Sequence, residues 1–413
     1  MINLLQGWEW KSLGEIFNIE RGGSPRPIKE FLTDKEDGIN WIKIGDIKNQ
    51  KYLYKTEEKI IQEGLKKSKL VIEGDLLVSN SMSFGKPVIV KLQKGAIHDG
   101  WLLLKEKINL NKEYFYYLFS SNFMYNFLSY QASGSTVKNL NIDKLKQIEI
   151  PLPPLKEQER IVGILDESFA KIDESIKILE QDLLNLDELM QSALQKAFNP
   201  LKDNAKENYK LPQGWEWKSL GEISNLIQNG FAASKNNEIP SGYVHLRTHN
   251  ISTDGNLNFD TLIKIKREFI KEKQSFIEKN DILFNNTNST ELVGKTALVT
   301  QNYNYAFSNH LTKIKLKNQY NSKLVVFYFV LLLKNKYFEK ICHQWIGQSG
   351  INIDKLKKIQ IPLPPLKEQE QIAKHLDFVF EKTKALKELY TKELKDYEEL
   401  KQSLLNKAFK GEL

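Results

Sequence analysis

The chain contains two copies of one sequence plan, and this duplication constrains its fold more than any other feature. The ten residues IPLPPLKEQE stand at Ile150–Glu159 and again, unchanged, at Ile361–Glu370. Three further segments recur in the same order, QGWEWKSLGEI (6–16 and 213–223), NIDKLK (141–146 and 352–357), and SALQKAF with its match SLLNKAF (192–198 and 403–409). We therefore expect the 413 residues to form two similar units of about 205 residues each.

Between these anchors the two copies diverge in a particular way. INWIKIGDI (39–47) stands opposite YVHLRTHNI (243–251), and GDLLVSNSMSFGKPVIV (74–90) stands opposite NDILFNNTNSTELVGKTALV (280–299). The apolar positions are kept while the polar residues change. This pattern predicts one scaffold that carries two different binding surfaces.

Each copy changes its periodicity after PLPPL. Before that point, short apolar runs alternate with Gly, Asn, Asp and Ser, which is typical of a mostly-β domain with a few helices. After it, apolar residues recur at steps of three and four. The fold class that follows is α+β, with two mostly-β domains separated by two long helices.

The helical stretches have the period of a coiled coil. We predict packing positions in the first copy at Leu165, Phe169, Ile172, Ile176, Leu179, Leu183 and Leu186. In the second copy we predict Leu376, Phe380, Tyr390, Leu394, Tyr397 and Leu404, with Thr383, Lys387 and Lys401 as polar interruptions. Antiparallel packing of the two helices within one chain would cover both seams, and a homodimeric coiled coil is the alternative.

The boundaries follow from the same patterns. They are a first domain at 1–152, a spacer helix at 153–200, a linker at 201–212, a second domain at 213–363 and a second spacer helix at 364–413, related by a pseudo-two-fold axis. The repeated decamer then lies where a strand ends and a helix begins, because its prolines deny ladder hydrogen bonds and favour helix entry. A PxxP ligand is the alternative interpretation of Pro151–Pro154.

Composition narrows the class of protein. Cys342 is the only cysteine in the sequence, which excludes a disulfide within one chain and fits a reducing, cytoplasmic setting. The first residues lack the pattern of a signal peptide. The most apolar run, Leu324–Leu333, is about half the length that spans a bilayer, so we expect a buried helix and no membrane partner.

The net charge of +8 is unevenly distributed. Residues 156–198 contribute −5 and residues 367–413 contribute 0, so the remaining residues carry +13. A basic excess outside the helices suits a polyanion such as DNA. A lysine-rich surface that reflects base composition of the genome is the alternative.

No catalytic constellation is apparent. VGKT (293–296) ends like a phosphate loop, but Ser289 replaces the required glycine. NPLKD (199–203) departs from a methyltransferase motif at Leu201. His245 and His249 share a strand face without further metal ligands. We expect a non-enzymatic chain that binds no metal or cofactor.

The remaining chemistry is recognition by polar loops, because Asn and Gln can bind adenine, Arg and Lys can bind guanine, and other basic groups hold phosphates. The candidates in the first domain are Arg21, Arg26, Lys43, Asn80, Lys86, His98 and Lys138. Those in the second are Asn229, Lys235, Arg247, His249, Asn285, Asn286, Asn288, Lys295, His310 and Gln348.

These motifs together resemble one known family over essentially the whole chain. GWEWKSLGEI, WIKIGDI, STVKNLNIDKLKQIEIPLPPLKEQERIV and the terminal KAFKGEL are similar to the specificity subunits of type I restriction–modification enzymes. The resemblance implies two target-recognition domains that each read half of an asymmetric double-stranded DNA site. It also implies helices that dock two methyltransferase subunits and, in systems that contain them, two restriction/translocase subunits. S-adenosylmethionine, ATP and Mg would then be needed only in those partners.

Two other functions remain open from the sequence. One is the recognition subunit of a type IIB/IIG-like system, in which a single partner fuses nuclease and methyltransferase. The other is a coiled-coil scaffold whose basic β domains bind proteins instead of DNA.

Overall fold

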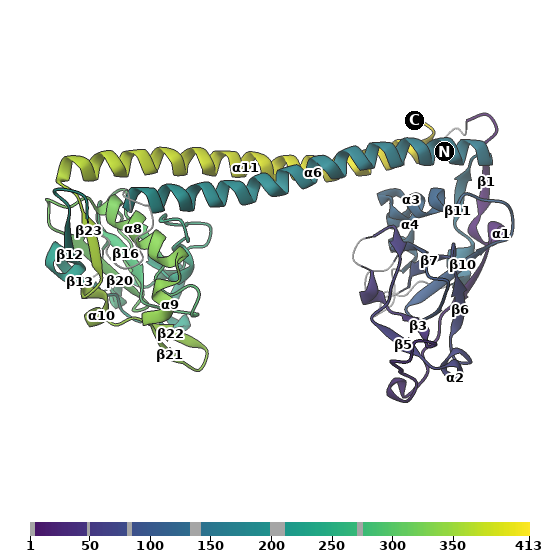
Figure 1. Cartoon of the computed structure of the whole chain (residues 1–413), viewed down its shortest axis with the longest axis horizontal. Helices are drawn as coiled ribbons and strands as arrows, with labels where there is room; N and C mark the ends of the chain where they lie inside the picture. Colours follow the sequence, from purple (N-terminus) through teal and green to yellow (C-terminus); the bar gives the residue numbers. More distant parts are fainter. Residues whose placement is uncertain (1–4, 48–49, 81–84, 133–141, 199–210, 271–275) are drawn as a thin grey trace. The chain divides into compact units, whose positions relative to one another are not determined.

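A computed structural model describes residues 5–47, 50–80, 85–132, 142–198, 211–270 and 276–413 (Figure 1). The chain divides into two compact units. Unit 1 comprises Met1–Leu179 with Thr391–Leu413, and unit 2 comprises Glu180–Tyr390. Each unit therefore holds its own β-rich region and a part of both long helices, α6 (Leu155–Phe198) and α11 (Leu366–Lys410).

The described residues of unit 1 form two larger sheets and one strand pair. The first sheet has the order β2 (Phe17–Arg21), β10 (Trp101–Glu106), β7 (Leu76–Ser79), β8 (Pro87–Val90), β4 (Tyr52–Leu53). The second has the order β5 (Glu58–Ile60), β3 (Ile39–Ile42), β9 (Lys94–Ile97), β6 (Lys69–Ile72), and β1 (Glu9–Ser12) pairs with β11 (Glu149–Leu152). The short helices are α1 (Leu13–Ile16), η1 (Ile28–Glu30), η2 (Ile44–Asp46), α2 (Gln62–Leu65), α3 (Lys112–Ser120), α4 (Asn122–Ala132) and α5 (Ile142–Lys146).

Unit 2 repeats this plan with local changes. Its main sheet has the order β13 (Ser224–Asn229), β20 (Leu311–Leu316), β16 (Ile282–Asn285), β18 (Thr296–Leu298). Its smaller sheets are β15 (Lys264–Ile265), β14 (Glu238–Leu246), β19 (Ala306–Phe307); β17 (Thr287–Asn288), β22 (Gln348–Gly350), β21 (His343–Trp345); and the pair β12 (Glu216–Ser219), β23 (Gln360–Leu363). The short helices are α7 (Leu220–Ile223), η3 (Lys235–Asn237), η4 (Thr248–Asn250), η5 (Arg267–Phe269), α8 (Ser322–Lys334), α9 (Tyr337–Ile341) and α10 (Ile353–Lys357).

The repeated segments adopt the same local structure in both units. Trp10 of β1 lies opposite Pro151 of β11, and Trp217 of β12 lies opposite Pro362 of β23. The first proline of each decamer thus lies inside a strand, and the strand ends one residue later. A two-stranded sheet consists of edge strands, which tolerate proline because one side of each strand needs no ladder hydrogen bond.

A buried glutamine explains why the decamer is repeated so strictly. The Gln158 side chain donates to the Pro153 carbonyl and accepts from the Asn111 backbone N–H, both at 2.9 Å. Asn111 caps the N-terminus of α3. In unit 2, Gln369 accepts from the backbone N–H of Asn321, which caps α8, also at 2.9 Å. One amide thereby fixes the start of each long helix against the start of a domain helix.

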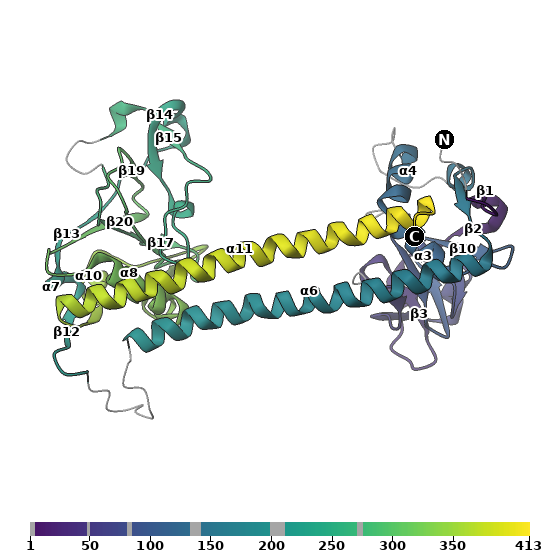
Figure 2. The same cartoon turned by 90° about the horizontal axis from the view of Figure 1, so that it is seen from above.

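The two long helices run side by side and antiparallel within each unit (Figures 1 and 2). All thirteen predicted packing residues are buried or half-buried. The buried ones are Leu165, Ile172, Leu179, Leu186, Leu376 and Phe380, and the half-buried ones are Phe169, Ile176, Leu183, Tyr390, Leu394, Tyr397 and Leu404. The α+β fold with two long helices is confirmed, and within each unit the packing is intramolecular.

The lysines that interrupt the second seam pair with acidic residues of α6. In unit 1, Lys401 Nζ lies 2.6 Å from Asp173 Oδ1, and in unit 2, Lys387 Nζ lies 2.6 Å from Asp187 Oδ1. Because 173 and 187, like 387 and 401, are two heptads apart, one antiparallel register accounts for both pairs. The interruptions therefore specify the register of the helix pair.

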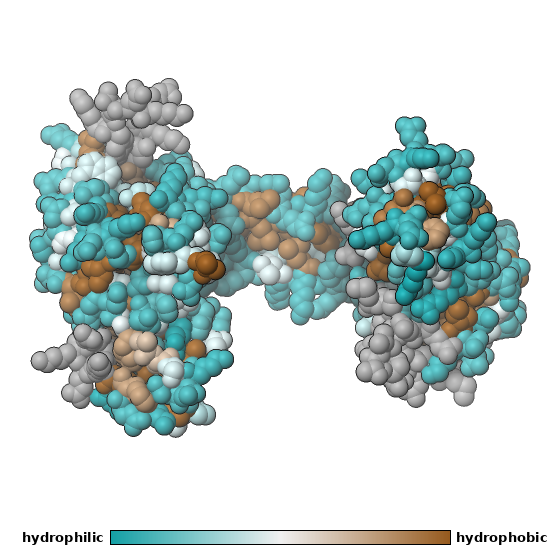
Figure 3. All heavy atoms as spheres, turned by 90° about the horizontal axis from the view of Figure 1, so that it is seen from below, coloured by the Kyte–Doolittle hydropathy of each residue, from teal (hydrophilic) through white to brown (hydrophobic). Residues whose placement is uncertain are grey.

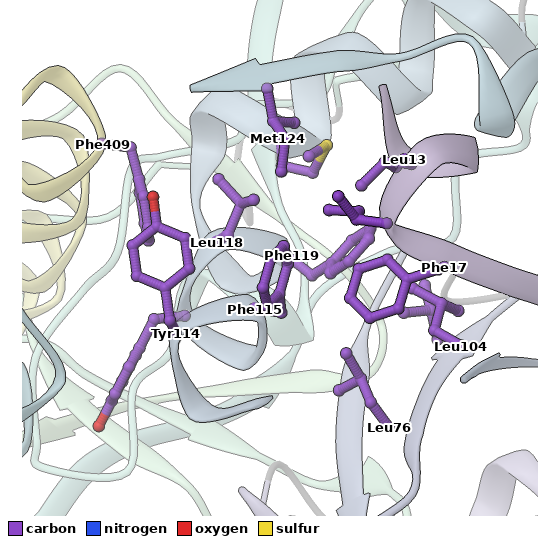
Figure 4. Packing of buried hydrophobic residues seen from close by; sticks show 14 of the residues in the cluster. Leu13, Phe17, Leu76, Leu104, Tyr114, Phe115, Leu118, Phe119, Met124 and Phe409 are labelled. Carbon is purple, nitrogen blue, oxygen red and sulfur yellow. The ribbon is translucent and has the colours of Figure 1, made fainter. Parts of the chain in front are cut away.

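Each long helix ends in the core of the unit opposite to the one in which it begins. In unit 1, Phe409 of α11 packs edge-on against Tyr114 at 5.4 Å, beside the contact of Phe17 with Phe115 at 4.8 Å (Figure 4). In unit 2, Phe198 of α6 packs edge-on against Tyr328 of α8 at 5.0 Å. The KAF ends of the two copies thus anchor the helices, which is why these short segments recur.

Candidate nucleic-acid interface

One glycine in each unit fixes where the candidate recognition loops begin. The Gly22 N–H donates to the Trp101 carbonyl at 2.9 Å, and the Gly230 N–H donates to the Leu311 carbonyl at 3.0 Å. A methyl group on Gly230 would lie 2.0 Å from the Phe307 carbonyl oxygen, and one on Gly22 would lie 2.3 Å from the His98 carbonyl oxygen. The backbones approach too closely for any side chain, so the loops after β2 and β13 leave the sheets at equivalent points.

In unit 1, Asp99 gathers several of the predicted residues. Its carboxylate accepts from the Ser24 hydroxyl at 3.0 Å and lies 2.8 Å from His98 Nδ1. Its backbone carbonyl accepts from Arg21 Nε at 2.9 Å, and Arg26 lies 3.9 Å from the carboxylate. The predicted residues Arg21, Arg26 and His98 therefore come together around one acidic residue that the sequence interpretation did not select.

This cluster borders a cavity of about 710 Å³. Arg26, Lys43 and His98 contribute to its walls, together with Trp41 and Glu58. Lys43 Nζ lies 3.0 Å from Glu58 Oε1, and the Arg26 side chain is 83% exposed. The cavity thus offers both hydrogen-bond donors and carboxylate acceptors. Carboxylates repel phosphates but can accept from the amino groups of cytosine or adenine, so this mixture suits base edges better than a phosphate backbone.

The other predicted residues of unit 1 are placed differently. Asn80 is fully buried, and its side-chain amide has no hydrogen-bond partner among the described residues. Lys86 is exposed and directly precedes β8. Lys138 lies outside the described residues, so its placement stays a prediction.

In unit 2 the equivalent position to Asn80 is occupied by a fully bonded asparagine. Asn286 Nδ2 donates to the Thr312 hydroxyl at 2.9 Å and to the Asn309 carbonyl at 3.0 Å. It also lies 3.3 Å from Asn229 Oδ1, which accepts from the Thr312 hydroxyl at 2.7 Å. The buried Asn286 therefore orients the exposed Asn229, which leaves Asn229 as the member that a ligand can reach.

Two basic residues of unit 2 are used inside the fold. Lys295 Nζ donates to the carbonyls of Thr248 and Ile251 at 2.9 and 2.7 Å, and burial lowers the pKa of this ammonium group. Arg247 Nη2 donates to the Ala233 carbonyl at 3.0 Å, and burial likewise lowers the pKa of its guanidinium group. Lys295 therefore holds the turn at η4 in place, and Arg247 ties the strand before that turn to the loop at Ala233. Both side chains are engaged within the fold.

Histidine 245 is part of the core and not of the surface. It is fully buried in β14, with Nε2 3.1 Å from the Phe231 carbonyl. Burial, followed by the charge of Arg247, lowers the pKa of His245 from 6.5 to about 4. Among the described residues no group of His, Cys, Asp and Glu could hold a metal ion.

The remaining predicted residues of unit 2 line its surface or lie beside it. Asn285 is buried, and its amide is satisfied when its oxygen faces Asn288 Nδ2 at 2.7 Å. Lys235, His249 and Gln348 are exposed, and Arg247, Asn288 and His310 are half-buried. Gln348 belongs to a hairpin whose tip is formed by Trp345 and Ile346, and the sequence analysis did not select these two residues. Two adjacent large apolar residues next to the polar Gln348 were the signal that could have identified them.

Two similar β-rich units that share a pair of long helices define a class of duplicated two-unit proteins. The model of the family "Type I restriction modification DNA specificity domain" matches residues 6–183 and 212–396. The chain belongs to this family and carries its domain twice. The family resemblance recognised in the sequence is thereby confirmed.

Individual relatives agree with this assignment. The chain is 25% identical to the type I restriction enzyme EcoBI specificity subunit of Escherichia coli, over 100% of this chain and 88% of the relative. It is 32% identical to the putative type I restriction enzyme MjaX specificity subunit of Methanocaldococcus jannaschii, over 48% of this chain and 52% of the relative.

Solved structures share the fold. A chain from a study of complex assembly and conformational transition of the type I R-M system matches with a TM-score of 0.79 and 21% identity, over 100% of both chains. The HsdS subunit from Thermoanaerobacter tengcongensis matches with a TM-score of 0.59 and 21% identity, over 100% of this chain and 98% of that one. No helix in the described part of the chain is long and apolar enough to cross a membrane.

Proposed function

We propose that this chain is the DNA sequence-specificity subunit of a type I restriction–modification complex and that it binds a bipartite, asymmetric site. The observation that carries the proposal is the contrast between conserved frames and divergent surfaces. Gly22 and Gly230 start the two candidate loops at equivalent points, whereas the side chains beyond them differ. Two frames with different surfaces are what a non-palindromic site of two half-sites requires.

The chemistry of each unit supports base recognition. In unit 1, Arg26, Lys43 and His98 offer donors beside the carboxylates of Glu58 and Asp99. In unit 2, the exposed amide of Gln348 can make the paired hydrogen bonds that an adenine edge accepts and donates. Asn229 Oδ1 already accepts from Thr312 and Asn286, so Asn229 can offer a base only its Nδ2 donors. Exposed lysines such as Lys86 and Lys235 can hold phosphates without reading the sequence.

We further propose that the long helices dock two methyltransferase subunits and, where the system contains them, two restriction/translocase subunits. Apolar patches interrupt the hydrophilic surface along the helices (Figure 3). In unit 2, α6 exposes Leu184 and Leu189, and α11 exposes Phe378, Leu386 and Leu389, with fractional exposures between 39% and 59%. Clustered exposed apolar residues of this kind mark surfaces that a partner covers.

In this account the chain contributes recognition and assembly, and the partners contribute catalysis. S-adenosylmethionine, ATP and Mg would be bound by the methyltransferase and restriction subunits. The basic excess outside the helices would attract the DNA duplex to the assembled complex.

Genome-wide mapping of methylated adenines tests the proposal. The chain is co-expressed with the methyltransferase subunit of the same genome in a host that lacks adenine methylation, and we expect one asymmetric split sequence to be modified. Arg26→Ala should relax the requirement at one position of a single half-site, whereas Lys94→Ala, at the other end of β9 from His98, should not. Absence of any sequence-selective methylation would contradict the proposal.

A further inference from the structure

A β-hairpin in unit 2 exposes two large apolar side chains at its tip. Strands β21 and β22 pair from His343↔Gly350 to Trp345↔Gln348, which leaves Ile346 and Gly347 as a two-residue turn. Ile346 is fully exposed, with a fractional exposure of 106%, and Trp345 is 56% exposed. Gly347 supplies the positive φ of 81° that the turn requires.

Folding does not account for isoleucine at this position. Turns favour Gly, Asn, Asp and Pro, and β-branched residues are rare in them. Ile346 follows an exposed tryptophan, so the tip presents two adjacent apolar side chains to water. Exposed apolar groups that gather at one place usually mark an interaction site, unlike those scattered singly.

The base of the hairpin is held firmly. Strand β22 also pairs with β17, where Thr287 lies opposite Gly350. The hydroxyl groups of Ser349 and Thr290 lie 2.8 Å apart, and Ser349 is buried. The Trp345 ring lies so close to Gly350 that a methyl group there would be 2.8 Å from it. The tip is therefore projected from an ordered sheet with its tryptophan in a defined orientation.

The surroundings of the hairpin favour a polyanion as its partner. Residues 334–358, which contain the hairpin, include six lysines and two acidic residues, a net charge of +4. Asn288 and Gln348, both predicted to contact DNA, lie on the strands next to the tip. An apolar tip on a segment of net positive charge, with amide side chains on the neighbouring strands, matches a duplex, whose charged backbones flank apolar base stacks.

We propose that Ile346, supported by Trp345, is an apolar wedge that enters a base step of the half-site read by unit 2 and locally unstacks it. Side chains such as isoleucine and leucine act in this way in DNA-bending proteins. This inference rests on the proposed function, because it specifies how unit 2 engages its half-site. With the wedge, binding affinity would depend on how easily that base step deforms. Hydrogen bonding by Asn229 and Gln348 alone does not create this dependence.

The test uses the full-length chain assembled with its methyltransferase subunit and a duplex that carries the mapped site. 2-Aminopurine, which pairs with thymine, replaces in turn each adenine within and beside both half-sites except the methylated adenines, because those can be flipped by the enzyme. With the wild-type complex we expect increased fluorescence at one step of a single half-site. Ile346→Ala should abolish this signal and weaken binding on the order of tenfold.

Two variants act as controls. Ile72→Ala removes another half-exposed isoleucine, at the end of β6 away from His98, and should change neither signal nor affinity. Ile346→Lys replaces the wedge with a positive charge. It should lose the fluorescence signal while the dependence of affinity on salt becomes steeper, because a new phosphate contact releases counterions.

The outcomes separate the two proposals. Two results would overturn the wedge while leaving the specificity function intact. One is site-specific binding by the wild-type complex without any increase in 2-aminopurine fluorescence, and the other is the same fluorescence increase in Ile346→Ala as in the wild type. Loss of complex assembly in Ile346→Ala would overturn it in favour of a protein-docking hairpin. If the wild-type complex binds no mapped site at all, the proposed function fails and the wedge fails with it.

Discussion

The two units share a frame and differ in how that frame presents its surface. In unit 1, Trp41 is a buried residue of β3, and Lys43, between β3 and η2, lines the cavity. In unit 2 the same two positions hold His245, which is buried, and Arg247, whose guanidinium group donates a hydrogen bond to the Ala233 carbonyl. The first position is thus buried in both units, whereas the second lines a cavity in unit 1 and bonds to the backbone of its own unit in unit 2.

The difference shows that duplication preserves contacts between backbone and core, while surface residues are exchanged freely. The glutamine of each decamer makes the same two hydrogen bonds in both units. Each unit also has an ion pair between an aspartate of a long helix and a lysine of its β-rich region, but the lysine comes from a different element in each unit. Asp166 on α6 pairs with Lys51, which precedes β4, whereas Asp377 on α11 pairs with Lys323 of α8.

The largest expected effect is at the shared glycines. Gly230→Ala and Gly22→Ala should each destabilise their unit by about 3 kcal/mol or more, because a methyl group would overlap backbone carbonyls that cannot move independently. Gly163→Ala is the matched control, since a methyl group there has nothing within 4 Å. Thermal unfolding of the three variants checks this. A normal melting temperature for only one of Gly22→Ala and Gly230→Ala would break the proposed equivalence, and normal values for both would contradict the steric overlap.

Removal of the domain-to-helix ion pair should destabilise unit 1 more than unit 2. Lys51 also contacts Glu113 at 3.2 Å, and the Tyr117 hydroxyl donates to Asp166, so this network is the more extensive one. We expect Asp166→Asn to cost about 2 kcal/mol and Asp377→Asn about 1 kcal/mol in urea unfolding.

Glu167→Gln is the control for both carboxylates, because its side chain is 71% exposed on the same helix. Equal losses at Asp166 and Asp377 would mean that the additional partners in unit 1 contribute nothing.

Acid should destabilise unit 2 through His245, for which unit 1 has Trp41 instead. The folded state holds the pKa of His245 near 4, below its ordinary value of 6.5, so it favours the neutral ring. This stability is complete above pH 6.5 and is lost as the pH falls toward 4. At pH 5 the loss is about 2 kcal/mol.

The measurement is the melting temperature at pH 7.5 and pH 5. His245→Gln keeps a neutral hydrogen-bonding group and should show a smaller decrease than the wild type. An identical decrease in both proteins would assign the acid sensitivity to other groups.

The smallest expected effect concerns the register of the helices. Lys401→Glu places a second acid beside Asp173, and it should destabilise unit 1 by about 1 kcal/mol. The double exchange Lys401→Glu with Asp173→Lys should restore most of the loss in a thermal scan. If the double variant is no more stable than Lys401→Glu, the pair does not specify the register.

Most of the fold follows from the sequence because its signals are local. Repeated motifs define the units, and steps of three and four residues identify the seam from Leu165 to Leu186. The pairing of Lys401 with Asp173 could not be predicted in this way, because it depends on which residues of two distant helices face each other. Local patterns do not contain that register.

The candidate site was less predictable for a related reason. Residue type alone does not distinguish Asn229, which is exposed, from Asn286, which is buried beneath it. The same holds for Lys295, whose ammonium group bonds two carbonyls. Burial is decided by tertiary contacts, and polar residues in a recognition loop can serve either the ligand or the loop.

The proposed function requires each unit to read its own half of one DNA site. Methylation mapping after exchange of residues 17–135 for those of a relative with a different specificity tests it most directly. We expect one half of the methylated sequence to change while the other half remains as in the wild type. A change in both halves, or in neither, would show that the units do not read separate half-sites.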